Sequence, residues 1–189
     1  SSANRVTLVL PISLQSKAIV CVAKSTSQLH YIEKILSKNF GNDYVIEIAT
    51  NSIEAMNYIV GLEDINVQTS VLITDYQIED MTGLDLMHLV EPKYHDIKMM
   101  LLAEGADIDF AEKIVNQNSV YSLVKLPLEE AHFVQLVANA CSKYDNEIKL
   151  NRIMQRLRMS EQEKSLILES ISESIIYINL NREIVWKNT

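Results

Sequence analysis

Apolar residues follow two alternating patterns along this chain. Short, almost wholly apolar runs predict buried strands, and they lie at residues 18–23, 44–49, 71–75, 98–102 and 121–124. Between the runs, apolar residues recur every three or four positions, which predicts amphipathic helices. Strands and helices therefore alternate five times. This order predicts an α/β fold, a doubly wound five-stranded parallel sheet with helices on both faces.

Residues that typically begin and end helices lie between the predicted strands. Ser25 or Ser27 can cap the first helix, and Asn51 can cap the second, because their side-chain oxygens accept hydrogen bonds from free backbone amides. Gly41 and Gly61 are predicted to end the same two helices. A fourth helix is expected over residues 107–116, and a fifth over residues 129–144.

One edge of the predicted sheet gathers charged side chains. Right-handed crossovers place the carboxyl ends of all parallel strands on the same edge, where open α/β sheets carry their chemistry. The central run ends in Asp75 and the fifth ends in Lys125, while Lys24 follows the first and Leu102 and Ala103 end the fourth. We therefore expect a carboxylate with cations nearby.

The composition disfavours several kinds of binding partner and cellular setting. The chain has 189 residues and a net charge of −8, and no basic patch stands out, which disfavours nucleic acid and anionic membranes as partners. No apolar run reaches the ~18 residues that a membrane span needs. Cys21 and Cys141 are the two cysteines and imply no disulfide, which fits a reduced, cytoplasmic setting.

The last quarter of the chain predicts a different organisation. Residues 145–172 contain no Gly or Pro and continue the fifth helix, with a three-then-four spacing of mostly apolar positions from Leu150 to Ile175. A parallel homodimer through this helix would bury the stripe. The alternative is a helix folded back onto its own domain. Residues 175–188 alternate strongly around a turn at Asn181, which predicts a β-hairpin.

The central stretch from Leu72 to Leu86 resembles response regulator receiver domains. The family pattern is an aspartate, two loop residues, an apolar–Pro pair, a Met and a Gly that opens a helix. It is matched by Asp75, Ile78, Met81, Gly83 and Leu84. Glu79 replaces the usual proline, and Lys125 matches the family lysine. The resemblance covers about residues 18–144 and implies a flavodoxin-like receiver fold, with Asp75 as acceptor of a phosphoryl group from a histidine kinase or phosphotransfer protein.

Two family features are missing. The acidic pair that holds Mg²⁺ after the first strand is replaced by Ala23 and Lys24. Asp75 and the backbone carbonyl of Gln77 remain as expected metal ligands, so any Mg²⁺ would bind weakly, and no other cofactor is indicated. The hydroxyl expected after the fourth strand is replaced by Leu102 or Ala103, depending on the alignment.

The extra lysine suggests a hypothesis for this edge. Lys24 or Lys125 would pair with Asp75 and partly substitute for the metal, because a cation within ~4–6 Å lowers the pKa of a carboxylate. Two interpretations of Asp75 remain. It is either phosphorylated inefficiently or part of a pseudo-receiver in which Asp and Lys form a structural ion pair, and we favour the second.

The segments together predict a signal-transducing module. Residues 1–17 would form an N-terminal arm, residues 18–144 the receiver-like domain, residues 145–172 a coiled-coil linker, and residues 173–189 the opening of a PAS-like domain. This segment is not expected to be an enzyme, and an output such as a kinase or diguanylate cyclase would lie beyond it. The alternatives are a flavodoxin-like cofactor-binding protein and a purely structural dimerisation module.

Overall fold

The computed structural model describes residues 16–115 and 120–181. Five parallel strands form one sheet in the order β2-β1-β3-β4-β5, and every strand pairs in parallel with its neighbours. The predicted doubly wound sheet is therefore confirmed. The strands are β1 (Lys17–Val22), β2 (Tyr44–Ala49), β3 (Gln68–Asp75), β4 (Lys98–Ala103) and β5 (Val120–Lys125).

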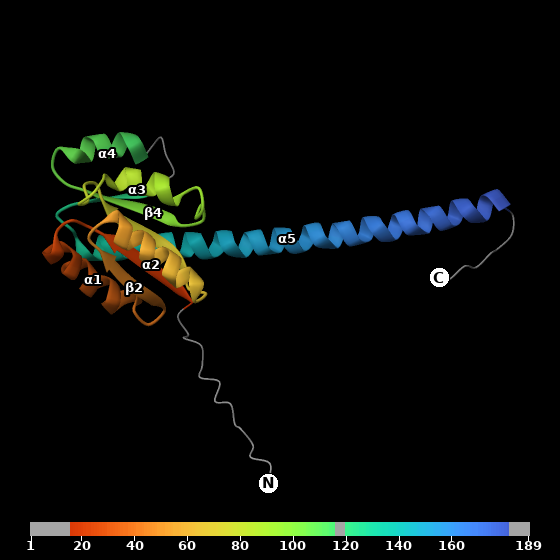
Figure 1. Cartoon of the computed structure of the whole chain (residues 1–189), viewed down its shortest axis with the longest axis horizontal. Coiled ribbons are helices and arrows are strands. Elements are labelled where there is room, and N and C mark those ends of the chain that lie inside the picture. Colours follow the sequence, from red (N-terminus) through yellow and green to blue (C-terminus); the bar gives the residue numbers. More distant parts are fainter. Residues whose placement is uncertain (1–15, 116–119, 182–189) are drawn as a thin grey trace, which may run out of the picture. The chain divides into compact units, whose positions relative to one another are not determined.

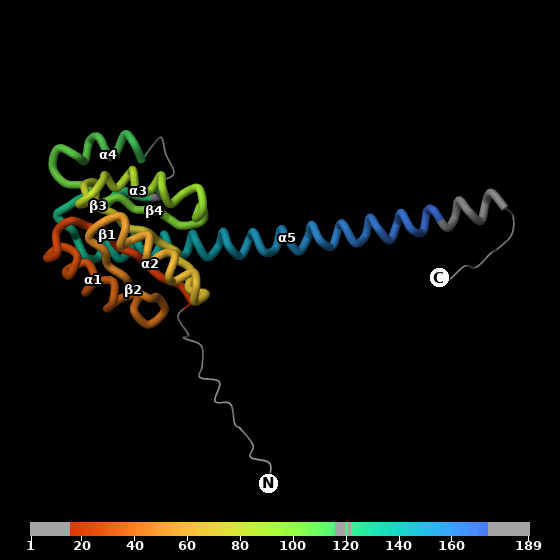
Figure 2. Tube along the Cα trace, viewed as in Figure 1, coloured from red at the N-terminus to blue at the C-terminus, as the bar shows by residue number. Residues whose placement is uncertain are grey.

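Helices cover both faces of the sheet (Figures 1 and 2). Helices α1 and the first part of α5 pack on one face, and α2, α3 and α4 pack on the other. Each face has its own buried apolar core, which we call the α1/α5 core and the α2–α4 core. The helices are α1 (Thr26–Phe40), α2 (Ser52–Asp64), α3 (Gly83–Val90), α4 (Asp107–Val115) and α5 (Glu130–Asn181).

Local capping explains where the helices begin. The side chains of Ser25 and Asn51 accept hydrogen bonds from the amides of the third residue after them, so both predicted caps are confirmed. Thr82 forms a reciprocal capping box with Asp85 at the start of α3. The predicted stop at Gly61 is wrong, because α2 continues through it to Asp64.

The chain divides into two compact units, Ser1–Asn146 and Glu147–Thr189. The second begins inside α5, so the predicted helical continuation over residues 145–172 is confirmed. The strand predicted from Ile175 is wrong, because α5 extends to Asn181. The rest of that predicted hairpin and the predicted arm over residues 1–15 lie outside the described residues.

None of the helices in the described ranges combines the length and the apolar character that a membrane crossing requires.

Gly83 sets how closely α3 approaches the end of β3. Its amide donates a hydrogen bond to the carbonyl of Tyr76 at 2.9 Å. A Cβ atom at this position would collide with the carbonyl oxygen of Asp75 and would lie 3.0 Å from Thr74 Oγ1. The glycine therefore permits a backbone contact that holds the loop after Asp75 in place.

We expect Gly83→Ala to lower the free energy of unfolding by about 1–3 kcal/mol, because the added methyl group must displace backbone atoms. The matched control is Gly61→Ala. Position 61 lies in the interior of a helix with no atom within 4 Å of an added Cβ, so this change should stabilise by roughly 0.5–1 kcal/mol. Urea unfolding measures both, and equal effects of the two substitutions would contradict the packing described for Gly83.

Candidate functional site

Asp75 lies in a cleft at the carboxyl edge of the sheet. The residue ends β3 and is half-buried. The cleft has a volume of about 500 Å³ and is formed by the segments that follow β1, β3 and β4, which confirms that these strand ends meet on one edge. Its lining residues are Lys24, Ser25, Gln28, Asp75, Tyr76, Gln77, Glu104 and Asp107.

The surroundings of Asp75 oppose its negative charge. Burial is the main cause that raises the pKa of its carboxyl group to about 6, and the nearby charges of Glu104 and Asp107 contribute to the same increase. One contact acts in the other direction, since the amide of Tyr76 donates a hydrogen bond to Asp75 Oδ1 at 3.1 Å. The carboxylate is therefore ionised at neutral pH, and no cation of the described residues lowers its pKa.

Lys125 does not reach Asp75. Asp75 is in register with Leu102, and Leu102 with Val124, so these three residues point to the same face of the sheet. Lys125 follows Val124 and points to the opposite face, where its ammonium pairs with Glu112 of α4. The predicted ion pair between Lys125 and Asp75 is therefore wrong.

The residue on the Asp75 face after Val124 is Leu126. It is partly buried and packs against the α1/α5 core, and its amide donates a hydrogen bond to the carbonyl of Ala103 at 2.9 Å. The peptide bond between Leu126 and Pro127 is cis. The end of β5 therefore presents an apolar side chain on the face where the resemblance implies a lysine.

Lys24 lines the same cleft as Asp75. Its side chain is exposed, and among the described residues no ion pair joins it to Asp75. The effects that raise or lower the pKa of Asp75 include no lysine. The hypothesis that an ammonium group substitutes for the metal is therefore wrong for Lys125, and for Lys24 it stays a prediction.

Leu102 and Ala103 end β4, where the resemblance implies a hydroxyl group. Leu102 is in register with Asp75 and is fully buried in the α1/α5 core. Ala103 points to the other face, is also buried, and is in register with Lys125. Neither side chain can donate a hydrogen bond, so whichever alignment is chosen, no hydroxyl from β4 faces Asp75.

The donor groups at this edge do not fit a Mg²⁺ site. The resemblance leaves Asp75 and the backbone carbonyl of Gln77 as ligands, and Gln77 forms an isolated antiparallel bridge with Thr82. Over the described ranges, no three His, Cys, Asp or Glu side chains are grouped to hold a metal ion. Glu104 and Asp107 also line the cleft, but they are not grouped with Asp75 closely enough to supply the oxygen ligands that a hard cation prefers.

The sequence pattern missed several residues around Asp75. Glu104 and Asp107 follow β4, and their position directly after a predicted strand end was the available signal. Phe110 follows the apolar period of α4, but its side chain is 54% exposed, and its ring packs edge-on against Tyr76 with centroids 6.1 Å apart. Asp80, in the loop between β3 and α3, accepts hydrogen bonds from the amide and hydroxyl of Ser52.

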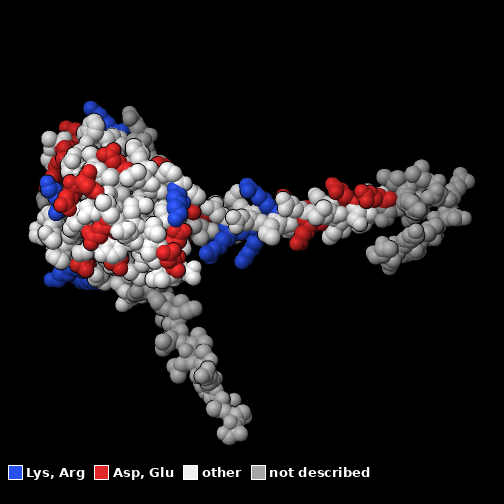
Figure 3. All heavy atoms as spheres, viewed as in Figure 1, with Lys and Arg blue, Asp and Glu red and all other residues white. Residues whose placement is uncertain are grey.

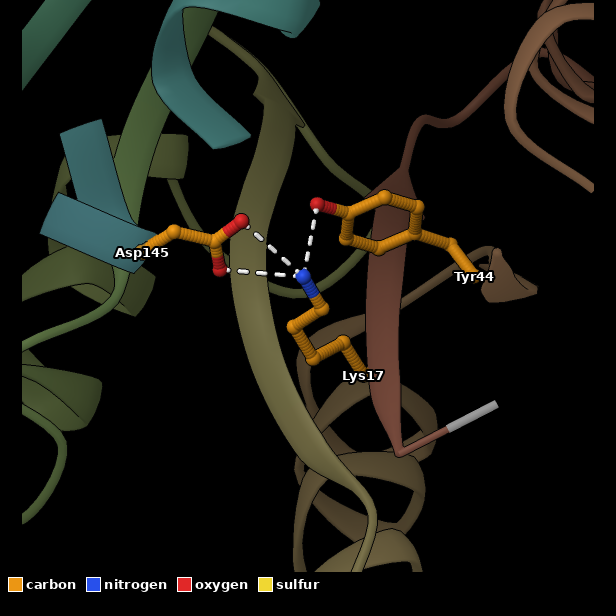
Figure 4. Close-up of polar contacts among 3 residues, drawn as sticks. All are labelled: Lys17, Tyr44 and Asp145. Atoms are coloured by element: carbon orange, nitrogen blue, oxygen red, sulfur yellow. Dashed lines mark hydrogen bonds and ion pairs between the residues drawn. The ribbon is translucent and has the colours of Figure 1, made fainter. Parts of the chain in front are cut away.

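A second polar cluster holds α5 against the sheet (Figure 4). The ammonium of Lys17, from the start of β1, lies 3.0 Å from both carboxylate oxygens of Asp145 on α5. It also donates a hydrogen bond to the hydroxyl of Tyr44 at 3.3 Å, from the start of β2. The cluster links both strands to the last turn of α5 within the first unit.

Solved structures share this fold at low sequence identity. A chain of adenylate cyclase from Rhodopirellula baltica is 18% identical, covers 75% of this chain and 98% of its own length, and has a TM-score of 0.65. The signal receiver domain of an HD domain-containing protein from Pseudomonas fluorescens Pf-5 is 16% identical over 75% of this chain and 98% of its own, with a TM-score of 0.61.

A response regulator receiver domain protein from Clostridium thermocellum is 19% identical, covers 71% of this chain and 97% of its own, and has a TM-score of 0.58. The fold is that of a signal receiver domain. No protein-family model and no curated protein matches the sequence. The receiver fold is thus supported by shape, with Asp75 at the expected edge and different neighbours around it.

We expect Asp75→Asn to stabilise the protein at pH 7–8 by roughly 1 kcal/mol, a modest gain because solvent screens a half-buried charge. The folded-state pKa of about 6 lies above the ordinary value of 3.8. Protonation of Asp75 therefore contributes stability that is fully present below about pH 4 and is lost as the pH rises through about 6. The gain from Asp75→Asn should accordingly disappear below about pH 4.

Urea unfolding between pH 4 and 8 measures this difference. The control is Lys125→Ala, which removes a cation from the other face of the sheet and should leave the midpoint of the Asp75 titration unchanged. A clear upward shift of that midpoint in Lys125→Ala would show that the lysine does act on Asp75.

Proposed function

We propose that this chain is the regulatory part of a two-component-type signalling protein, in which a receiver-like domain controls a dimeric helix. The observation that carries the proposal is the continuity of α5. The helix contributes Phe133, Val137 and Ala140 to the core of the domain and continues without interruption beyond Asn146. A change in the domain that moves this helix would therefore reach whatever the helix binds.

The helix after Asn146 carries an apolar stripe that needs a partner. Leu150, Met154, Leu157, Leu168 and Ile171 are between 43% and 63% exposed, and they follow the three-then-four spacing of a coiled-coil seam. Water contact with so much apolar surface is unfavourable, and a second copy of the helix would remove it. A homodimer through this helix is therefore part of the proposal.

The proposal includes loss of phosphoryl transfer at Asp75. Transfer to an aspartate depends on positive charge and hydrogen-bond donors that stabilise the phosphoryl oxygens. Here Lys125 points to the other face, Leu102 replaces the hydroxyl, and Glu104 and Asp107 add negative charge. A histidine kinase or phosphotransfer protein that docked on this edge would meet an aspartate without these aids.

The output is proposed to lie after α5. The solved structures with this fold include chains named for an adenylate cyclase, an HD domain-containing protein and a response regulator, so the fold accompanies differently named proteins. A PAS-like domain after residue 173 rests on the sequence pattern alone, and its first predicted strand is not formed, because α5 extends to Asn181. The flavodoxin-like alternative is disfavoured, because the acidic side chains of the cleft would repel a phosphate-bearing cofactor.

We expect no phosphoryl adduct on the wild-type chain after incubation with acetyl phosphate and Mg²⁺, because the groups that stabilise the transferred phosphoryl do not face Asp75. Intact mass spectrometry measures the adduct. An active receiver domain treated in parallel shows that the donor is competent, and Asp75→Ala identifies any adduct at another residue. An adduct on the wild type that Asp75→Ala abolishes would overturn the loss of phosphoryl transfer.

We expect the full chain to be a dimer at micromolar concentration and a chain ending at Asn146 to be a monomer, because the apolar stripe lies beyond that residue. Light scattering measures both masses, and circular dichroism checks that the shortened chain is folded. Leu157→Glu, on the stripe, should weaken the dimer at least about tenfold. Met159→Glu is the matched control, since it alters an apolar side chain of similar exposure, 64% against 59%, away from the stripe.

If the full chain has the same monomeric mass as the shortened one, the helix folds back or stays single, and the dimer proposal fails.

A further inference from the structure

Charges of opposite sign are segregated along the helix after Asn146 (Figure 3). From residue 148 to residue 160 every charged side chain is basic: Lys149, Arg152, Arg156 and Arg158. From residue 161 to residue 173 the charges are mainly acidic: Glu161, Glu163, Glu169 and Glu173, with Lys164 as the exception. All of these side chains are exposed. The helix thus has a basic half and an acidic half.

The apolar stripe defines a seam with two charged positions at its centre. Its described positions are residues 150, 154, 157, 161, 164, 168 and 171. All are apolar except Glu161 and Lys164, which occupy one a and one d position of the heptad pattern. The direction of a partner helix therefore decides which side chains these two meet.

A parallel, in-register partner would place equal charges together. Each seam residue would then face its own copy, so that Glu161 meets Glu161 and Lys164 meets Lys164 in adjacent layers. Basic and acidic halves would also lie beside their own kind, at an interaxial distance of 8–10 Å that is close to the ~8–10 Å screening length at physiological salt. Both arrangements are unfavourable.

An antiparallel partner centred between Glu161 and Lys164 removes both conflicts. In this register an a position meets a d position, so Glu161 faces Lys164 of the other copy, twice by symmetry. The next layers pair Leu157 with Leu168, and the basic half lies along the acidic half. The seam remains apolar on both sides of a central pair of complementary charges.

Apolar residues beside the seam favour the same direction. Ile153 and Ile167 are 54% and 59% exposed and both occupy the g position of the heptad. In an antiparallel pair g positions lie beside g positions along one edge of the seam, so Ile153 and Ile167 of both copies would line the same edge. In a parallel pair g faces e, and Ile153 would instead meet Arg158.

We infer that residues 147–173 bind a second copy of this chain in antiparallel orientation, centred between Glu161 and Lys164. The inference rests on the homodimer proposed above and replaces the parallel arrangement expected from the sequence. The partner surface is the same helix, recognised by its apolar seam and its reversed order of charge.

Cysteine cross-linking of the full chain tests the direction. Leu157→Cys alone and Leu168→Cys alone should give little oxidised dimer, because each thiol would face a leucine, and the double variant Leu157→Cys/Leu168→Cys should give covalent dimer readily. The wild type is the control, since its Cys21 and Cys141 are buried. A parallel dimer would instead link each single variant to itself, and that result would overturn the inference while leaving the dimer intact.

Charge exchange gives a test that adds no cross-link. Glu161→Lys should raise the dissociation constant of the dimer at least about tenfold, because lysine would then face lysine in two layers. The double variant Glu161→Lys/Lys164→Glu should restore dimerisation, because complementary charges meet again. Sedimentation equilibrium measures all three proteins.

The outcomes separate the two proposals. In a parallel dimer the single and double variants keep like charges in contact, so the dissociation constant would change little and the antiparallel inference would fail. A wild-type chain that is monomeric at every concentration would remove the dimer itself, and the orientation with it.

Discussion

Adjacent residues of a strand point to opposite faces of a sheet, and this alternation determines what surrounds Asp75. The registers of β3, β4 and β5 align Asp75 with Leu102 and Val124 on the face covered by α1 and α5. A cation at the end of β5 can compensate Asp75 only from position 124 or 126. Lys125 lies between these positions, so its ammonium pairs with Glu112 on the other side of the sheet.

This one-residue offset explains the electrostatics of the cleft. Asp75 keeps one amide donor from Tyr76, while burial and the charges of Glu104 and Asp107 oppose ionisation. Phosphoryl transfer to an aspartate is helped by cations that offset the charge on the phosphoryl oxygens, whereas here Glu104 and Asp107 add negative charge around Asp75. The fold places the carboxylate at the edge where such sites occur. Its chemistry differs because Lys125 points to the other face of the sheet and acidic side chains follow β4.

The predictions from the sequence were confirmed where the spacing of apolar residues alone determines whether a segment is a strand or a helix. Alternating apolar runs and helical repeats predicted the sheet, and the caps Ser25 and Asn51 follow from local chemistry. The face of the sheet to which Lys125 points could not be predicted. A mostly apolar run of four residues does not show which of its side chains point to which face, so it does not fix the direction of the next residue either. The pairing of β4 with β5 also shifts between Met99 and Met100, and such a shift leaves no mark in the sequence.

The expectations for Gly61 and Phe110 also failed because of contacts in the folded protein that the local sequence does not show. Gly61 suggested a helix end, but the helix interior accepts it because its solvent side is open. Phe110 follows the apolar period of α4 yet packs on Tyr76 at the surface. The spacing of apolar residues predicts a seam on the long helix, and its described positions are exposed, whereas the proposed direction of pairing depends also on the charges and the flanking positions.

The proposed antiparallel pairing would determine how a change passes along α5. The cluster of Lys17, Tyr44 and Asp145 fixes the helix to the sheet just before Asn146, and no Gly or Pro interrupts the helix afterwards. In an antiparallel pair the two points of attachment lie at opposite ends of the shared segment, about 40 Å apart for residues 147–173 at 1.5 Å per residue. Each domain would then be linked to the far end of its partner's helix, so a change at one Asp75 edge would act on the partner through the shared seam, without any contact between the two sheets.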